Sequence, residues 1–109
     1  MFRDILIIKQ MVEIVDKILL YSNDFDSAEC FVQDARSYDA TLMNFIALGE
    51  LVNKLTEDFR NIHSHIDWRK IYAFRNIIAH DYFGTDEEEV WQIIRKHIPK
   101  LREDLLGIV

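Results

Sequence analysis

Cysteine, proline and glycine are scarce in this chain of 109 residues, which contains one cysteine, one proline and three glycines. A single cysteine excludes an intramolecular disulfide and fits a reducing compartment. So few turn-forming residues argue against a turn-rich β fold, and a hydrophobic content of 50% favours packed helices. The length and composition therefore predict one α-helical domain that spans residues 1–109.

Long apolar runs and a strong excess of basic residues are also lacking. No segment has the length of a membrane span, and the first residues are unlike a secretory signal, so we expect a cytoplasmic protein that does not enter a membrane. The net charge of −6 argues against a protein whose whole surface coats nucleic acid. Between residues 54 and 75, however, five basic residues outnumber three acidic ones. This excess indicates either a local basic rim or ordinary solvated helix ends.

Apolar residues recur at intervals of three and four along most of the chain, which predicts amphipathic helices. The expected ranges are about 3–21, 26–33, 35–59, 68–82 and 86–105, with an irregular connector at 60–66. Asp26 and Asp67 are expected to cap the second and fourth helices, Gly84 to end the fourth, and Thr85 to begin a capping box for the fifth. Pro99 should kink or divide the fifth. The pattern predicts an all-α antiparallel bundle of four main helices plus one short helix.

Two adjacent residues of the expected third helix, Gly49 and Glu50, are candidates for a structural or functional role. Gly49 costs about 1 kcal/mol against alanine inside a helix, which makes sense if another helix crosses closely there. Glu50 is expected to pair with Lys54 one turn later rather than to serve a site.

Histidines outside the central motif have ordinary explanations. His63 and His65 lack the neighbouring cysteines or carboxylates that a metal site needs, so no metal is expected. His97 lies on an apolar stripe, where a satisfied buried or rim histidine is expected rather than a catalytic one.

The stretch from Phe74 to Tyr82 places polar, reactive side chains in an otherwise apolar helical segment. At about 100° per residue, Asn76 and His80 stack on one side, and Arg75 and Tyr82 form a second row. Arg75 and His80 then point about 140° apart, so both reach one atom only if the helix end is distorted or a second chain supplies one of them. The alternative is an amphipathic helix whose polar side chains are merely solvated.

The order Arg75-Asn76-x3-His80-x-Tyr82 resembles the signature of the HepT-like ribonuclease toxins, a branch of the HEPN superfamily. The likeness covers nearly the whole chain and is densest from Ile46 to Leu101. It includes Ile46-Ala47-Leu48-Gly49-Glu50, Trp68-Arg69-Lys70-Ile71, Val90-Trp91-x-Ile93 and Pro99-x-Leu101. The chain departs from the usual pattern in lacking prolines before the tryptophan, and in carrying leucine after the Gly-Glu pair. Neither departure touches the motif.

The residues of the motif suit metal-independent cleavage of RNA, which carries its own nucleophile in the 2′-hydroxyl. His80 suits a general base because the pKa of a free histidine is about 6.5. Arg75 offers a fork of donors to phosphate oxygens, and Asn76 is a supporting residue that could hold the His80 ring or contact RNA. DNA should survive, no cofactor is expected, and the sequence does not identify the RNA, for which tRNA is one candidate.

The resemblance implies further properties that the residues alone do not. It implies a homodimer with the motif facing a cleft between subunits, and a toxin–antitoxin pair. In that family a nucleotidyltransferase antitoxin of the MNT type attaches AMP to the motif tyrosine, which is Tyr82 in this chain. Two alternatives stay open: a non-catalytic helical partner of such a nucleotidyltransferase, and a helical interaction module without nucleotide chemistry.

Overall fold

The computed structural model describes residues 2–81 and 87–109, with the side chains of residues 79–81 left out of the description. All regular structure in these residues is helical, as the sequence predicts. The elements are α1 (Phe2–Ser22), α2 (Ala28–Gln33), α3 (Ala35–Lys54), α4 (Glu57–Ile62), α5 (Trp68–Asp81), α6 (Glu87–Gln92), the π-helix η1 (Ile93–His97) and α7 (Ile98–Leu106).

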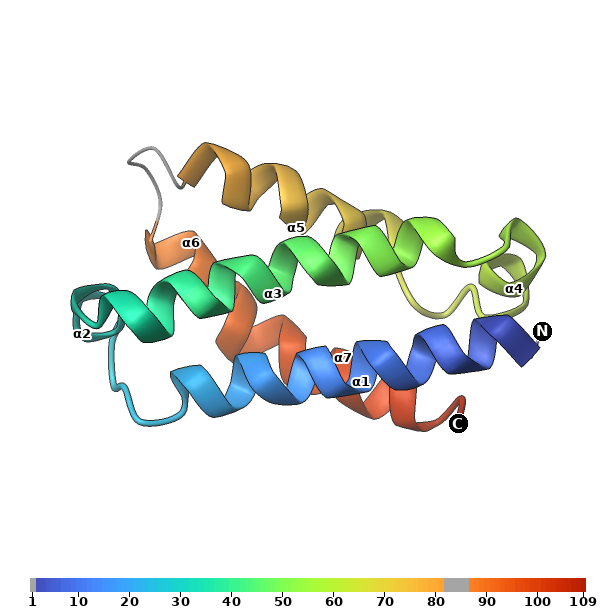
Figure 1. Ribbon diagram of the computed structural model, residues 1–109, viewed down its shortest axis with the longest axis horizontal. Helices are drawn as coiled ribbons and strands as arrows, with labels where there is room; N and C mark the ends of the chain where they lie inside the picture. Colours follow the sequence, from blue (N-terminus) through green and yellow to red (C-terminus); the bar gives the residue numbers. More distant parts are fainter. Residues whose placement is uncertain (1, 82–86) are drawn as a thin grey trace.

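The long helix α3 lies at the centre of the arrangement, between α1 and α5 (Figure 1). The last helical segment, formed by α6, η1 and α7, crosses behind these helices, and α7 packs against α1 (Figure 1). The short helix α2 packs against α3 and α6, while α4 lies at the opposite end of the molecule. The predicted all-α bundle is therefore confirmed.

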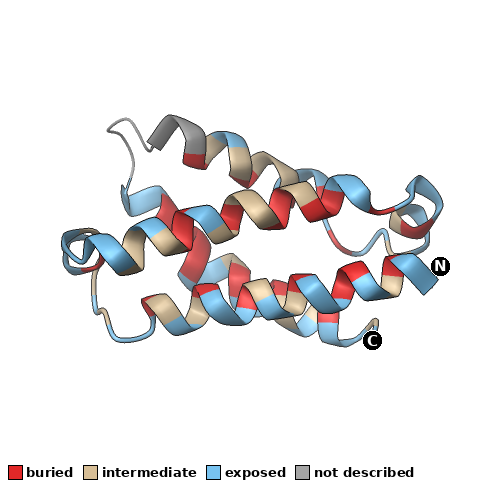
Figure 2. Ribbon diagram, viewed as in Figure 1, coloured by how far each residue is buried: buried red, intermediate tan, exposed pale blue. Residues whose placement is uncertain are grey.

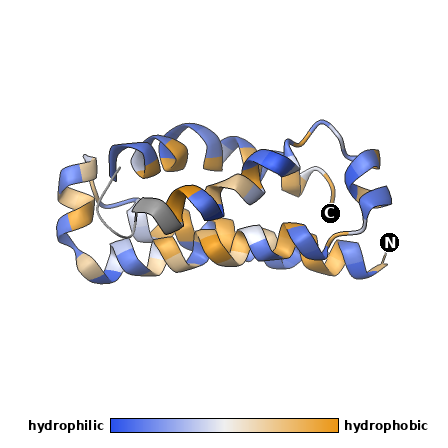
Figure 3. Ribbon diagram, turned by 90° about the horizontal axis from the view of Figure 1, so that it is seen from above, coloured by the Kyte–Doolittle hydropathy of each residue, from blue (hydrophilic) through white to orange (hydrophobic). Residues whose placement is uncertain are grey.

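The core forms because each long helix turns an apolar stripe toward the others. Buried residues recur along α1 and α3 (Figure 2), and hydrophobic and hydrophilic residues alternate along the helices (Figure 3). Phe45 of α3 and Phe74 of α5 meet edge to face, with ring centroids 5.9 Å apart. Phe31 of α2 lies 5.6 Å from Trp91 of α6, which joins the short helix to the bundle.

The predicted third helix is wrong in its length, because α3 ends at Lys54 and α4 begins at Glu57. Leu55 is extended, with φ −69° and ψ 143°, and the Thr56 hydroxyl caps α4 by accepting a hydrogen bond from the Phe59 N–H. Asp4 of α1 fixes this break: its carboxylate accepts from the Thr56 N–H at 2.9 Å and from the Thr56 hydroxyl at 3.0 Å. The expected irregular connector is correspondingly shorter, since residues 60–62 belong to α4.

Other predicted boundaries have mixed outcomes. Asp67 caps α5 as expected, because its carboxylate accepts from the Lys70 N–H at 3.1 Å. The cap of α2 is Ser27 rather than Asp26, since the Ser27 hydroxyl accepts from the Cys30 N–H. The interruption expected near Pro99 is confirmed: a π-helical turn precedes α7, and the proline lies at its first turn, where no N–H is needed. The expected roles of Gly84 and Thr85 lie outside the described residues.

Candidate active site

Arg75 lies where α5 crosses α3 at close range. A Cβ atom added to Gly49 of α3 would lie 3.2 Å from the Arg75 Cβ, so the absence of a side chain at Gly49 lets the two helices approach. The close crossing expected from this glycine is therefore confirmed. As a result of this close crossing, the Arg75 side chain projects from α5 directly beside α3.

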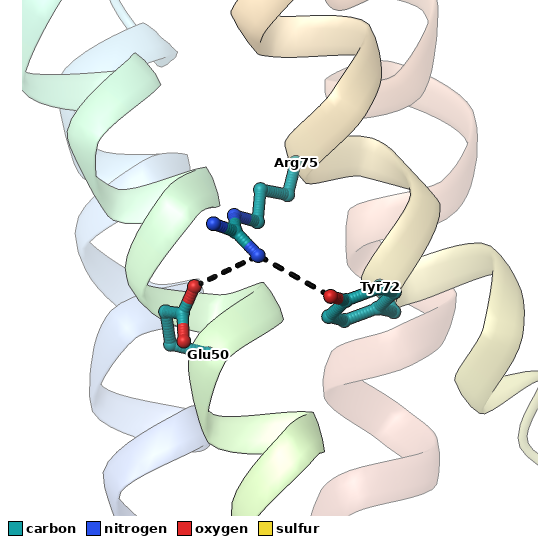
Figure 4. A network of polar contacts seen from close by, with 3 residues as sticks. All are labelled: Glu50, Tyr72 and Arg75. Carbon is teal, nitrogen blue, oxygen red and sulfur yellow. Dashed lines mark hydrogen bonds and ion pairs between the residues drawn. The ribbon is translucent and has the colours of Figure 1, made fainter.

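The Arg75 guanidinium contacts a polar side chain on each of the two helices (Figure 4). Its Nη1 atom lies 3.1 Å from Oε1 of Glu50 and donates to the Tyr72 hydroxyl at 3.2 Å. The side chains of Arg75 and Glu50 are 42% and 46% exposed. Both contacts use Nη1, and among the described residues the remaining N–H groups of the guanidinium have no partner, so a phosphate oxygen could accept from them.

Glu50 and Tyr72 are residues of the candidate site that the sequence did not lead us to include. Glu50 pairs with Arg75 across the helix crossing, whereas the expected partner was Lys54 on the same helix. Gly49 next to Glu50 was the available signal, because a glycine at a helix crossing places its neighbours beside the other helix. Tyr72 lies one turn before Arg75, so its contact follows from the i,i+3 spacing.

The remaining motif residues are described only in part. Asn76 is exposed on α5. His80 lies in the last turn of the same helix, but its side chain is outside the described residues, as is the whole of Tyr82. The backbone of α5 stays α-helical through Asp81, so it shows no distortion before His80 that would turn Arg75 and His80 toward each other. The roles assigned to Asn76, His80 and Tyr82 stay predictions.

A pocket of about 780 Å³ with both polar and apolar walls opens between the end of α3, α4 and the first turns of α5. Tyr72 lines it, so the tyrosine that accepts from Arg75 also borders this pocket. Arg60 and Arg69, two residues of the expected basic rim, line it as well, whereas Lys54 borders a different hollow between α1 and α3.

Two of the other histidines, His63 and His97, take structural positions, whereas His65 is exposed and lines the pocket. The His63 ring packs against Phe59 at 4.5 Å, and its carbonyl accepts from the buried Trp68 indole. Burial and the positive charges of Lys70 and Lys96 lower the pKa of His97, which favours its neutral form. His97 is therefore a partly buried rim histidine, as expected.

Neither a metal-binding cluster nor a membrane-spanning helix occurs in the described part of the chain. Residues 2–81 and 87–109 contain no group of three or more histidine, cysteine, aspartate or glutamate side chains arranged to hold a metal ion. Among the helices described, none combines the length and apolar character needed to cross a bilayer.

Comparison with known proteins gives a consistent result. A family model described as "Ribonuclease HepT-like" matches residues 11–107. A Methanocaldococcus jannaschii protein named "Gamma-glutamylcyclotransferase and putative RNase" is 30% identical over 94% of this chain, which spans 46% of that relative's length. A "Putative RNase" of Caldanaerobacter subterraneus subsp. tengcongensis is 34% identical over 76% of this chain and 74% of its own. A "Probable ribonuclease HepT" of Thermococcus cleftensis is 30% identical over 68% of this chain and 67% of its own. No solved structure matches significantly.

Proposed function

We propose that this chain, which belongs to the HepT-like ribonuclease family, is a metal-independent endoribonuclease and the toxin of a toxin–antitoxin pair. The observation that carries the proposal is the placement of Arg75. Its guanidinium is oriented by Glu50 and Tyr72, is half-exposed, and has donors without a partner among the described residues, on the helix that also bears His80.

The proposed reaction is an internal transfer at an RNA phosphodiester. His80 takes the proton from the 2′-hydroxyl, and that oxygen attacks the neighbouring phosphorus. The bond to the 5′-oxygen breaks, this oxygen takes up a proton, and a 2′,3′-cyclic phosphate remains. Arg75 stabilises the negative charge that develops on the phosphate oxygens, and Asn76 holds the His80 ring or contacts the RNA. DNA lacks the nucleophile and is not cleaved.

A homodimer is part of the proposal because one helix points its two catalytic residues in different directions. On an α-helix Arg75 and His80 project about 140° apart, and α5 is regular over both positions. A second copy across a two-fold axis would bring another Arg75 and His80 to the same cleft. RNA cleavage would then depend on both subunits.

Regulation is proposed to act at Tyr82. A nucleotidyltransferase antitoxin would attach AMP to its hydroxyl, and the added negative charge beside Arg75 and His80 would repel RNA phosphate. The main alternative is that the chain does not cleave RNA and serves only as a helical partner of that nucleotidyltransferase. The two hypotheses differ at His80, which only the nuclease needs.

The test is cleavage of end-labelled RNA, including tRNA, by the purified chain in excess EDTA. The chain is made without its partner, and intact mass confirms that Tyr82 is unmodified. We expect a cyclic phosphate product, with activity at least about a hundredfold lower in His80→Ala, since general base catalysis contributes about that much or more. Arg75→Ala should lose a similar factor.

Two control variants sharpen the test. Arg36→Ala changes an exposed arginine at the far end of α3 and should cleave normally. Tyr82→Phe removes only the hydroxyl, so it should cleave RNA and resist silencing by the nucleotidyltransferase. An unmodified dimer that cleaves none of the RNAs would favour the binding-partner alternative, and cleavage that survives His80→Ala would refute the proposed mechanism.

A further inference from the structure

We propose that the pocket between α3, α4 and α5 binds a nucleotide of single-stranded RNA next to the cleaved bond. This inference rests on the proposed nuclease function and extends it to a substrate-binding subsite. The pocket volume of about 780 Å³ is in the range of sites that hold a small molecule or a nucleotide.

Two arginines of the pocket have no polar partner among the described residues. Arg75 pairs with Glu50, Arg95 donates to the Phe25 carbonyl, and Arg102 pairs with Asp16. Arg60 and Arg69 line the pocket, and within residues 2–81 and 87–109 neither guanidinium forms a hydrogen bond or ion pair. Their donors are free to bind an anion with several acceptor oxygens, such as a phosphodiester.

The rest of the wall suits a base and a sugar. Exposed amide side chains of Asn53 and Asn61 can each donate and accept hydrogen bonds, as recognition of a base edge requires. The floor includes the buried residues Val52 and Ile66 and the Trp68 ring. An apolar floor with polar groups around it is the usual construction of a small-ligand site.

The Trp68 ring is held in place before any ligand arrives. Its indole N–H donates to the Arg60 carbonyl at 3.2 Å and to the His63 carbonyl at 3.1 Å. These bonds connect the end of α4 to the start of α5, so the two walls of the pocket are fixed relative to each other. A preformed site loses less free energy to ordering when it binds.

Tyr72 connects the pocket to the candidate active site. It lines the pocket, its hydroxyl accepts from Arg75, and the Arg75 guanidinium lies 6.0 Å from its ring centroid. A strand of RNA with one phosphate at Arg75 could therefore continue over Tyr72 toward Arg69 and Arg60. An aromatic ring beside cationic side chains is typical of proteins that bind single strands, because bases stack on the ring while the cations contact phosphates.

The charge balance of the pocket points to a nucleotide rather than to a bare phosphate. Glu57 and Asp67 also line the wall, so two carboxylates accompany the two arginines. One of them is already engaged, because Asp67 caps α5 through the Lys70 N–H. A free phosphate would meet little net positive charge here, whereas a nucleotide gains from hydrogen bonds and stacking in addition.

The experiment measures binding separately from cleavage. The probe is a fluorescein-labelled single-stranded RNA dodecamer of mixed sequence in which every 2′-hydroxyl is methylated, so that it cannot be cleaved. Binding to the unmodified chain is followed by anisotropy at several salt concentrations. We expect the Arg60→Gln, Arg69→Gln double variant to bind about tenfold more weakly. Its salt dependence should be shallower by about 0.7 units of log–log slope for each phosphate that the two arginines no longer neutralise, as for single strands in general.

Arg36→Gln is the matched control, because Arg36 is an exposed arginine far from the pocket, in the first turn of α3. It should bind the probe like the parent chain. In cleavage assays the double variant should raise KM and leave kcat at saturating RNA nearly unchanged, since Arg75 and His80 are intact.

The possible results distinguish the subsite proposal from the nuclease proposal. Equal probe binding by the double variant, the control and the parent chain would overturn the subsite, even if all three cleave RNA. Pocket-dependent binding by a chain that cleaves no RNA would support the subsite while the nuclease proposal fails. A change from dimer to monomer in the double variant, measured by sedimentation, would overturn the subsite and assign the pocket to contact with a second copy.

Discussion

At the scale of single residues, the position of the Arg75 guanidinium depends on its two partners, Glu50 and Tyr72. Glu50 forms an ion pair with the Arg75 Nη1 atom, and the Tyr72 hydroxyl accepts a hydrogen bond from the same nitrogen. The pair is half-exposed, so it contributes no more than about 1 kcal/mol to stability. Its importance should therefore lie in the orientation of the guanidinium.

Glu50→Ala is predicted to lower kcat for RNA cleavage about tenfold, because a guanidinium that is free to rotate is less well positioned for phosphate. Glu50→Gln should recover part of this loss, since the amide oxygen can still accept from Arg75. The free energy of unfolding, measured with urea, should change by less than about 1 kcal/mol in both variants.

Glu103→Ala is the control for removal of an exposed carboxylate, because Glu103 lies on α7 away from the site. If Glu50→Ala and Glu103→Ala have the same kcat as the parent chain, Glu50 has no positioning role.

At the scale of helices, the crossing of α3 and α5 depends on Gly49. We predict that Gly49→Val destabilises the protein by about 1–3 kcal/mol, because the added atoms meet the Arg75 Cβ and must push the helices apart. Gly49→Ala should be close to neutral, since its better helix propensity, worth about 1 kcal/mol, offsets a shift of a few tenths of an ångström.

Met43→Val places the same side chain on the same helix at a residue that is 65% exposed, and it should change stability by less than about 0.5 kcal/mol. Thermal or urea unfolding of the three variants tests the prediction. Equal stabilities for Gly49→Val and Met43→Val would mean that the crossing tolerates a larger side chain.

The helices that the sequence predicted correctly are those whose signals are local. The spacing of apolar residues predicted α1. Asp67 predicted the start of α5, and Pro99 predicted the interruption before α7. The break between α3 and α4 was missed because Leu55 and Phe59 keep the i,i+4 spacing across it, and hydrogen bonds to Asp4 stabilise it. No local pattern carries information about those long-range bonds.

The candidate site follows the same division between local and long-range information. Arg75 could be found from its motif, and the close crossing could be predicted from Gly49. The pairing of Glu50 with Arg75 could not, because it depends on how far α3 and α5 rotate about their own axes as they cross. The pocket beside Tyr72 depends on the break at Thr56, so the sequence pattern could not predict it either.

At the scale of the whole molecule, Asp4 ties the first helix to the joint between α3 and α4. Burial would raise the pKa of this carboxyl, but hydrogen bonds from the Thr56 N–H and hydroxyl favour the charged form, and the net pKa is lowered. A lowered pKa means that the unfolded chain binds the proton more tightly than the folded one. The stabilisation is therefore complete above the unfolded pKa of about 3.9 and is lost as the pH falls through the folded value.

Asp4→Asn is predicted to lower the free energy of unfolding by about 1–3 kcal/mol at pH 7, because the variant has no charged acceptor for the two hydrogen bonds from Thr56. The difference from the parent chain should stay constant down to about pH 5 and shrink below about pH 4. Urea unfolding at a series of pH values measures it. A difference that grows on acidification would contradict the assigned sign.

The contact between Asp4 and Thr56 joins positions that are 52 residues apart, so it also determines which parts of the chain open together. The Thr56 amide donates to Asp4, and the Phe59 amide donates to the Thr56 hydroxyl, which Asp4 anchors, so release of the start of α1 exposes the first amide and loosens the cap of the second. In native-state hydrogen exchange these two amides should therefore exchange in the same cooperative opening as the first turns of α1. Motion of one end of the chain would then reach the wall of the pocket between α3, α4 and α5 without passing through the motif.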